Sequence, residues 1–105
     1  KLLGVGALKR PKAEHRAGLF KRASAQVSSE PFTIELGWLA GADDAMPPIV
    51  AALVVHAAER PVFVNTRTDE TALHMSLAQH GFRIVGAPFA SSHGAYSNQI
   101  YIRGT

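Results

Sequence analysis

The sequence of 105 residues contains no cysteine, and this absence excludes a disulfide framework, a thiolate metal site and a cysteine nucleophile. It also lacks a long apolar run, because the longest, such as residues 49–55, are far shorter than the roughly 20 residues that cross a bilayer. No basic and then apolar leader begins the chain. These absences predict a soluble, cytoplasmic protein with no membrane partner.

What the sequence does contain is typical of one globular domain. Apolar residues make up 47% of the chain and charged residues 18%, and 105 residues are too few for two ordinary domains. We therefore expect residues 1–105 to form a single domain. Because the chain begins with Lys1 and runs at once into an apolar segment, we also expect an N-terminal part of that domain to be missing from this sequence.

Positive charge is concentrated at the N-terminal end. Residues 1–22 carry seven basic side chains and one acid, whereas residues 23–105 carry four basic side chains and seven acids. A basic segment can attract phosphate on nucleic acid or on a nucleotide-like cofactor, but a solvated amphipathic helix has the same composition. Because Phe20 is the only aromatic side chain in the segment and no nucleic-acid-binding motif is present, we expect no nucleic-acid partner.

The spacing of apolar residues predicts alternating strands and helices. We expect strands at residues 2–8, 32–39, 62–65, 82–85 and 96–102, and helices at residues 12–25, 46–57 and 69–80. Pro47 and Pro48 suit the first turn of the second helix, Thr68 or Asp69 suits the cap of the third, and Gly81 suits the left-handed position that ends it. This order indicates an α/β fold, a mixed and mostly antiparallel sheet with helices on both faces.

Several segments resemble, in their order and spacing, the C-terminal two thirds of a GCN5-related N-acetyltransferase (GNAT) domain. They are ELGWL at residues 35–39, PVFVNTR at 61–67 and DETALHMSLAQHGF at 69–82, and GVGALK at 4–9 is similar to the family's second strand. The similarity covers nearly the whole chain. It implies an acyl-CoA N-acyltransferase-like fold, in which strands 32–39 and 62–65 are adjacent and parallel and the helix after Met46 joins them.

The resemblance implies transfer of an acetyl group from acetyl-CoA to a small-molecule or peptide amine. In such a domain, backbone groups after the first of these two strands contact the pantetheine arm, and the next helix N-terminus holds the pyrophosphate. The end of the second parallel strand is also a usual ligand position in an open α/β sheet. The cofactor-binding residues expected on these grounds are Trp38, Leu39, Ala40, Gly41, Met46, Pro47, Asn65 and Thr66. We expect Gly37→Val to weaken acetyl-CoA binding without unfolding the domain.

Glu35 and Tyr96 are the candidate catalytic residues. Glu35 is the only carboxylate on its strand, and it could take the amine's proton through water, although a strand carboxylate can also face solvent or pair with a basic neighbour. The tyrosine that often acts as general acid in the family is missing, because Leu77 occupies its position. Tyr96 and Tyr101 are expected on the last strand, where they could also serve packing alone.

The expected pyrophosphate loop departs from the family pattern, because residues 41–46 hold one glycine and two aspartates. Either this is a degenerate loop of a non-catalytic binding domain, or a flexible loop is absent between Ala45 and Met46. We expect the second, so that the chain between Asp43 and Pro47 is disordered or interrupted and the helix from Pro47 presents free amides to the gap. An ordered loop with both aspartates facing the cleft would favour the non-catalytic alternative.

The remaining polar residues suggest no further site. The five histidines have neither the spacing of a zinc helix nor a cysteine partner, so no metal is expected. A homodimer is plausible, because a truncated domain would leave many apolar positions exposed.

Overall fold

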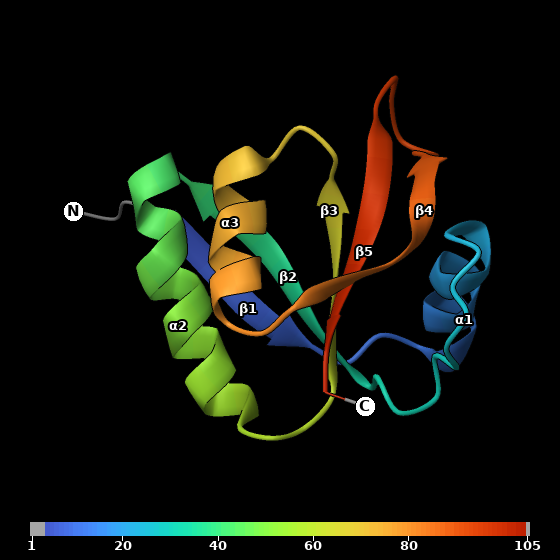
Figure 1. The fold of residues 1–105 in the computed structure, drawn as a ribbon, viewed down its shortest axis with the longest axis horizontal. Coiled ribbons are helices and arrows are strands. Elements are labelled where there is room, and N and C mark those ends of the chain that lie inside the picture. Colours follow the sequence, from blue (N-terminus) through green and yellow to red (C-terminus); the bar gives the residue numbers. More distant parts are fainter. Residues whose placement is uncertain (1–3, 105) are drawn as a thin grey trace.

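The computed structural model describes residues 4–104 as a five-stranded sheet with three α-helices (Figure 1). The elements, in order, are β1 (Gly4–Lys9), α1 (Ala13–Arg22), β2 (Ile34–Gly41), the short 3-10 helix η1 (Asp43–Ala45), α2 (Met46–Ala57), β3 (Val62–Arg67), α3 (Thr71–Gln79), β4 (Arg83–Ala90) and β5 (Ser97–Arg103). The strand order across the sheet is β1-β2-β3-β5-β4. Lys1 and the other residues of 1–3, together with Thr105, lie outside the described part, and so does the side chain of Trp38.

The strand directions confirm a mixed and mostly antiparallel sheet. β2 and β3 are parallel, as expected for two strands that a crossover helix joins, while the pairs β1–β2, β3–β5 and β4–β5 are antiparallel. α2 is that crossover helix, and its first turn contains Pro47 and Pro48 as the sequence predicts. Gly81, with a φ of 83°, follows the end of α3 in the predicted left-handed conformation.

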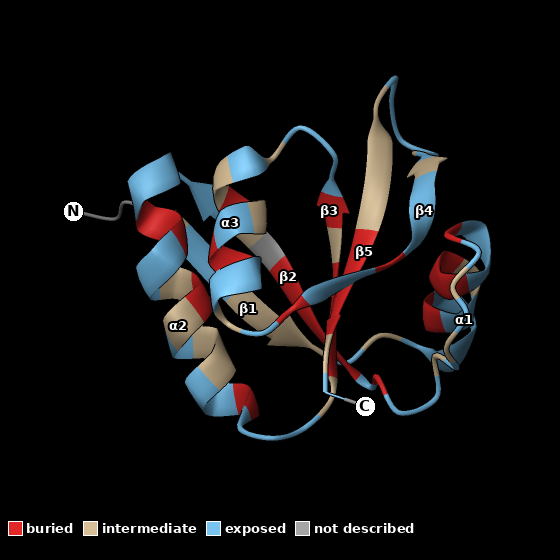
Figure 2. Ribbon diagram, in the orientation of Figure 1, coloured by how far each residue is buried: buried red, intermediate tan, exposed pale blue. Residues whose placement is uncertain are grey.

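Helices cover both faces of the sheet, and the alternation of side chains along β3 shows why. Val62 and Val64 point to a core beneath α2 and α3, whereas Phe63 points to the other face and meets the ring of Phe20 from α1 edge-on, with 5.5 Å between the centroids. Figure 2 shows the buried stretch along β3, with the outer surfaces of the helices exposed. The two cores fix β2 and β3 in the middle of the molecule.

Some expected boundaries are wrong. β2 begins at Ile34 and ends at Gly41, about two residues later than predicted at each end, and β5 begins one residue after Tyr96. Neither Thr68 nor Asp69 caps α3, because the helix begins only at Thr71 and the Asp69 carboxylate binds Arg67 instead.

Arginine side chains close the C-terminal ends of α2 and α3. Arg103 donates to the carbonyls of His80 (3.0 Å) and Ala58 (2.9 Å), and Arg60 donates to the carbonyl of Ala57 (2.9 Å). The last carbonyls of a helix have no partner within the helix, so these guanidinium groups satisfy them. Among residues 4–104, no helix has the length and apolar character needed to cross a membrane.

Candidate ligand site between β2 and β3

β2 and β3 run side by side for only part of their length. Their register consists of three pairs, the last of which is Leu36 with Val64. Beyond this pair, β2 continues to Gly41 along β1, and β3 continues to Arg67 along β5. The two strands therefore separate, as Figure 1 shows, and their facing backbones are not joined by a ladder of hydrogen bonds there. We call the space beyond Leu36 and Val64 the opening.

Three pockets lie at the opening. The floor pocket, about 220 Å³, lies at the point where the strands separate and includes Glu35 and Asn65 in its lining. The mouth pocket, about 480 Å³, lies between the end of β2 and the start of α3 and shares Leu39, Glu70 and Leu73 with the floor pocket. The α1-face pocket, about 380 Å³, shares Asn65 with the floor pocket. Asn65 is thus shared by the floor pocket and a pocket on the α1 side of the sheet.

Glu35 places a buried carboxylate in the floor pocket. The residue is 7% exposed, and its Oε1 atom has no hydrogen-bond donor. The Lys9 ammonium lies 3.9 Å from Oε1, which is an ion-pair distance but too long for a hydrogen bond. Burial raises the pKa of the Glu35 carboxyl above its ordinary value, while the charges of Lys9 and His15 act in the opposite direction. The carboxylate is therefore poorly compensated.

Asn65 adds a second buried acceptor to the same pocket. Its Oδ1 atom is also buried without a hydrogen-bond partner. Within the described residues, the third such side-chain atom is Arg16 Nε in α1. The two residues that carry unpartnered acceptor atoms, Glu35 and Asn65, both line the floor pocket. Buried polar atoms in folded proteins nearly always have partners. Two acceptors without donors in one pocket indicate a site for a group that carries several N–H bonds.

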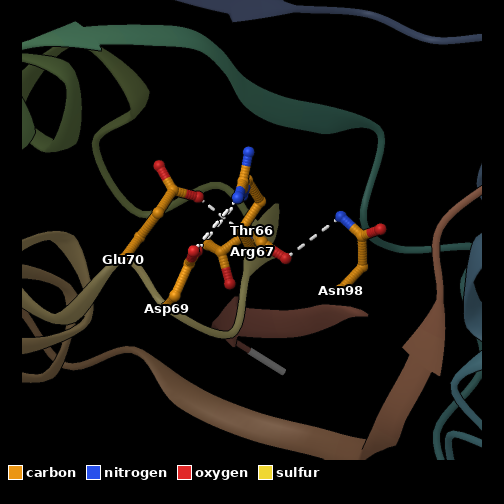
Figure 3. Close-up of polar contacts among 5 residues, drawn as sticks. All are labelled: Thr66, Arg67, Asp69, Glu70 and Asn98. Atoms are coloured by element: carbon orange, nitrogen blue, oxygen red, sulfur yellow. Dashed lines mark hydrogen bonds and ion pairs between the residues drawn. The ribbon is translucent and has the colours of Figure 1, made fainter. Parts of the chain in front are cut away.

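The turn from β3 to α3 neutralises the arginine at the mouth (Figure 3). Arg67 donates two hydrogen bonds to the Asp69 carboxylate, at 3.1 Å and 3.0 Å, and its backbone N–H donates to Glu70 Oε1 at 2.7 Å. The hydrogen bonding between the Arg67 and Asp69 side chains lowers the pKa of the Asp69 carboxyl and raises the pKa of the Arg67 guanidinium. The Arg67 guanidinium also lies 4.3 Å from the ring centre of Tyr96. Arg67 is therefore already engaged by a carboxylate and a ring.

The chain at the start of α2 is continuous and ordered, so the expectation of a gap between Ala45 and Met46 is wrong. Ala45 donates its N–H to the carbonyl of Ala42 at 2.9 Å, and Met46 donates to that of Asp43, which closes η1 directly onto α2. Both Ala45 and Met46 are buried. Small side chains allow this tight 3-10 turn, and burial of Met46 anchors it.

This N-terminus offers no amides to a phosphate. The N–H of Met46 is used within η1, and the next two residues, Pro47 and Pro48, have none. The prediction that the helix from Pro47 presents free amides is therefore also wrong. Carboxylates of Asp43, Asp69 and Glu70 line the mouth pocket against the single cation of Arg67.

The residues present do not fit the pyrophosphate of acetyl-CoA. Helix N-termini bind phosphate through free N–H groups and the positive end of the helix dipole, and the first turn of α2 has no free N–H groups. The excess of carboxylates at the mouth repels an anion.

Of the other residues predicted to bind a cofactor, Leu39, Gly41 and Met46 line the mouth pocket. Ala40 is exposed and pairs with Val5 of β1. Pro47 is exposed in the first turn of α2, and Trp38 lies in β2 with its side chain outside the described part of the molecule.

Thr66 and Tyr96 lie away from the floor pocket. Thr66 is 1% exposed, and its hydroxyl donates to the carbonyl of Gln99 (2.9 Å) and contacts His74 Nε2 (3.0 Å), so it belongs to the packing beneath α3. Tyr96 precedes β5, where the sequence predicts a strand residue, and lines the α1-face pocket. Glu35 and Tyr96 therefore line different pockets.

Sequence reasoning missed Lys9 and Glu70 as lining residues. Lys9 faces Glu35 across the β1–β2 pair, but a register shift between Val5 and Ala7 hides this pairing from the sequence pattern. Glu70 lies between a predicted strand and a predicted helix. This position in the sequence does not show which pocket its side chain lines.

Metal ligands do not gather anywhere in residues 4–104: no group of three His, Cys, Asp or Glu side chains there could hold an ion. Comparisons of the chain with protein-family models, with curated proteins and with solved structures find no match.

Proposed function

We propose that this chain is a binding domain that holds a protonated amine in the opening between β2 and β3. The observation that carries the proposal is the pair of buried acceptors, Glu35 Oε1 and Asn65 Oδ1, in the floor pocket. A buried acceptor without a donor costs the folded state about 1–3 kcal/mol. A primary ammonium has three N–H bonds and can satisfy both acceptors at once.

Charge and shape at the floor pocket support the same ligand class. Glu35 and Glu70 contribute two carboxylates to its lining against the single ammonium of Lys9. Leucine side chains from β2 and α3, Leu39 and Leu73, supply apolar surface for the alkyl part of an amine. A cation with a short alkyl chain fits this combination better than an anion does.

The architecture we propose for the domain is acyl-CoA N-acyltransferase-like. The sequence resemblance supports it, and so do the parallel β2–β3 pair, the crossover by α2 and the separation of the two strands beyond Leu36. On this view, the ordered acidic turn of residues 43–45 is a degenerate cofactor loop, and the domain retains the amine site without the phosphate site.

Acetyl transfer from acetyl-CoA to an amine is the second candidate function. Two observations favour it: β2 and β3 separate beyond Leu36 and Val64, and Glu35 is a buried carboxylate with a raised pKa that could accept a proton from an amine. The acidic mouth and the missing amides at α2 place it second.

Calorimetric titration of the full chain separates the two candidates. We expect n-butylamine to bind, and Glu35→Gln to weaken this binding about tenfold, because one charge-assisted hydrogen bond is lost. Glu59→Gln, which changes an exposed glutamate just after α2, is the matched control and should leave binding unchanged. Equal affinity of Glu35→Gln and the parent would contradict the proposal.

Acetyl-CoA is titrated at two salt concentrations in the same series. We expect no saturable heat at either concentration, since the mouth repels the pyrophosphate. Saturable binding of acetyl-CoA, followed by the appearance of N-acetylbutylamine in a mixture with n-butylamine, would replace the proposed function by the second candidate.

A further inference from the structure

We infer that the ligand of the opening is a linear diamine, with one ammonium at Glu35 in the floor pocket and the other at Asp43 in the mouth pocket. This inference rests on the proposed function and adds the length and the second charge of the ligand. It is carried by the adjacency of the two pockets, which share three lining residues, and by the distribution of carboxylates along them.

The floor and mouth pockets can hold one elongated molecule. They share three lining residues, Leu39, Glu70 and Leu73, so the two pockets adjoin each other beside β2. Leu39 and Leu73 give the middle of this path apolar surface, beside the carboxylate of Glu70. Carboxylates therefore stand at both ends of the path, at Glu35 and Asp43, with apolar surface between them, which matches a chain of methylene groups that ends in two ammonium groups.

Asp43 is the mouth carboxylate that remains available for a ligand. Asp69 is occupied by both nitrogens of the Arg67 fork, and Glu70 accepts the backbone N–H of Arg67. In the described part of the chain, no hydrogen bond or ion pair engages the side chain of Asp43. The second ammonium thus has a carboxylate at the mouth that is not already bound.

Two further observations, besides the carboxylates of the mouth pocket, favour a cationic ligand. Glu35 is more than nine-tenths buried, its Oε1 atom accepts no hydrogen bond, and the residue lines the adjoining floor pocket. The mouth also shows a preference for a cation, because the first turn of α2 has no free N–H groups for an anion. Both observations point to a positively charged molecule that enters at Asp43 and reaches Glu35.

The test compares n-butylamine with the diamines putrescine, cadaverine and hexamethylenediamine, titrated into the full chain by calorimetry. We expect at least one diamine to bind roughly fivefold more tightly than n-butylamine, the gain that one partly exposed ion pair gives, and we expect this gain to shrink at high salt. Asp43→Asn should remove the gain and leave n-butylamine unchanged.

Asp44→Asn is the matched control, because Asp44 is the exposed neighbour of Asp43 in η1 and lies outside the lining of the mouth pocket. It should keep the full diamine gain, and equal thermal unfolding midpoints of the two variants show that both are folded. Diamines no tighter than n-butylamine would overturn this inference, as would equal losses in Asp43→Asn and Asp44→Asn. If n-butylamine and every diamine fail to bind, the proposed function falls as well, so the two failures are distinguishable.

Discussion

The two ends of the β2–β3 pair differ in how their polar groups find hydrogen-bond partners. Where the strands begin, the closed end, Arg103 and Arg60 donate to the last carbonyls of α2 and α3. Where the strands separate, Glu35 and Asn65 keep acceptors that no donor in the described protein reaches. At the closed end these carbonyls find donors within the protein, whereas the acceptors at the opening are those that we propose a ligand satisfies.

This difference has an energetic consequence. Substitutions at the closed end remove contacts or hydrogen bonds that the fold uses, so they should lower the free energy of unfolding. Substitutions at the opening remove groups that the empty fold does not use, so they should leave stability unchanged or raise it while weakening binding. The comparison can therefore be tested, because substitutions at the two ends should change the free energy of unfolding in opposite directions.

The largest effect is expected from Phe32→Ala at the closed end. Phe32 is fully buried just before β2, with its ring centre 5.7 Å from that of Phe20. Truncation leaves a cavity between α1 and the sheet, and we expect the free energy of unfolding to fall by about 3–5 kcal/mol. Urea denaturation followed by circular dichroism measures this change. A loss below about 1 kcal/mol would show that this core does not hold the closed end.

Arg103→Met should give the next largest effect. It keeps much of the side-chain length but removes the donors to the carbonyls of His80 and Ala58, so we expect a loss of about 2 kcal/mol in the same measurement. Arg83→Met is the control, because Arg83 makes one exposed hydrogen bond, to the Gly104 carbonyl, whereas Arg103 makes an exposed one and a part-buried one. Similar losses in both variants would contradict the special role of Arg103.

Glu35→Gln should have the opposite sign. Burial raises the pKa of this carboxyl in the folded state, so between the unfolded and folded pKa values the folded protein binds more protons than the unfolded chain. The free energy of unfolding therefore falls as the pH rises through this window, and above it the buried charge destabilises the fold. We expect Glu35→Gln to remove this fall and to raise the stability near neutral pH by about 1 kcal/mol.

The measurement is a series of urea denaturations from acidic to neutral pH. The stability difference between Glu35→Gln and the parent should grow as the pH rises. A difference that is constant across this range, or a variant less stable than the parent near neutral pH, would show that Lys9 fully compensates the charge of Glu35.

Much of the fold follows from local sequence patterns, because alternation along β2 and β3 identifies their buried faces and a crossover helix requires a parallel pair. The same patterns identify Glu35 and Asn65, which lie on or at the end of these strands. They do not show how far two strands stay together, since separation depends on the competing pairings of β2 with β1 and of β3 with β5. The small residues around Asp43 have no period that distinguishes a tight turn from a flexible loop, so η1 could not be predicted.

Gly37→Val should have the smallest effect on stability and a clear effect on binding, because it alters the opening without touching either core. A Cβ atom at residue 37 would lie 2.2 Å from Cδ of Lys9, so the flexible lysine side chain must move. We expect a loss in the free energy of unfolding below about 1 kcal/mol, since a β-branched residue suits a strand. The new side chain fills part of the floor pocket, and we expect n-butylamine affinity to fall about tenfold or more, with any acetyl-CoA binding weakened as well.

Calorimetry and urea denaturation of the same Gly37→Val preparation measure the affinity and the free energy of unfolding. Equal relative losses of folding and binding would mean that Gly37 serves the fold rather than the opening, and the contrast between the two ends would then not extend to this residue.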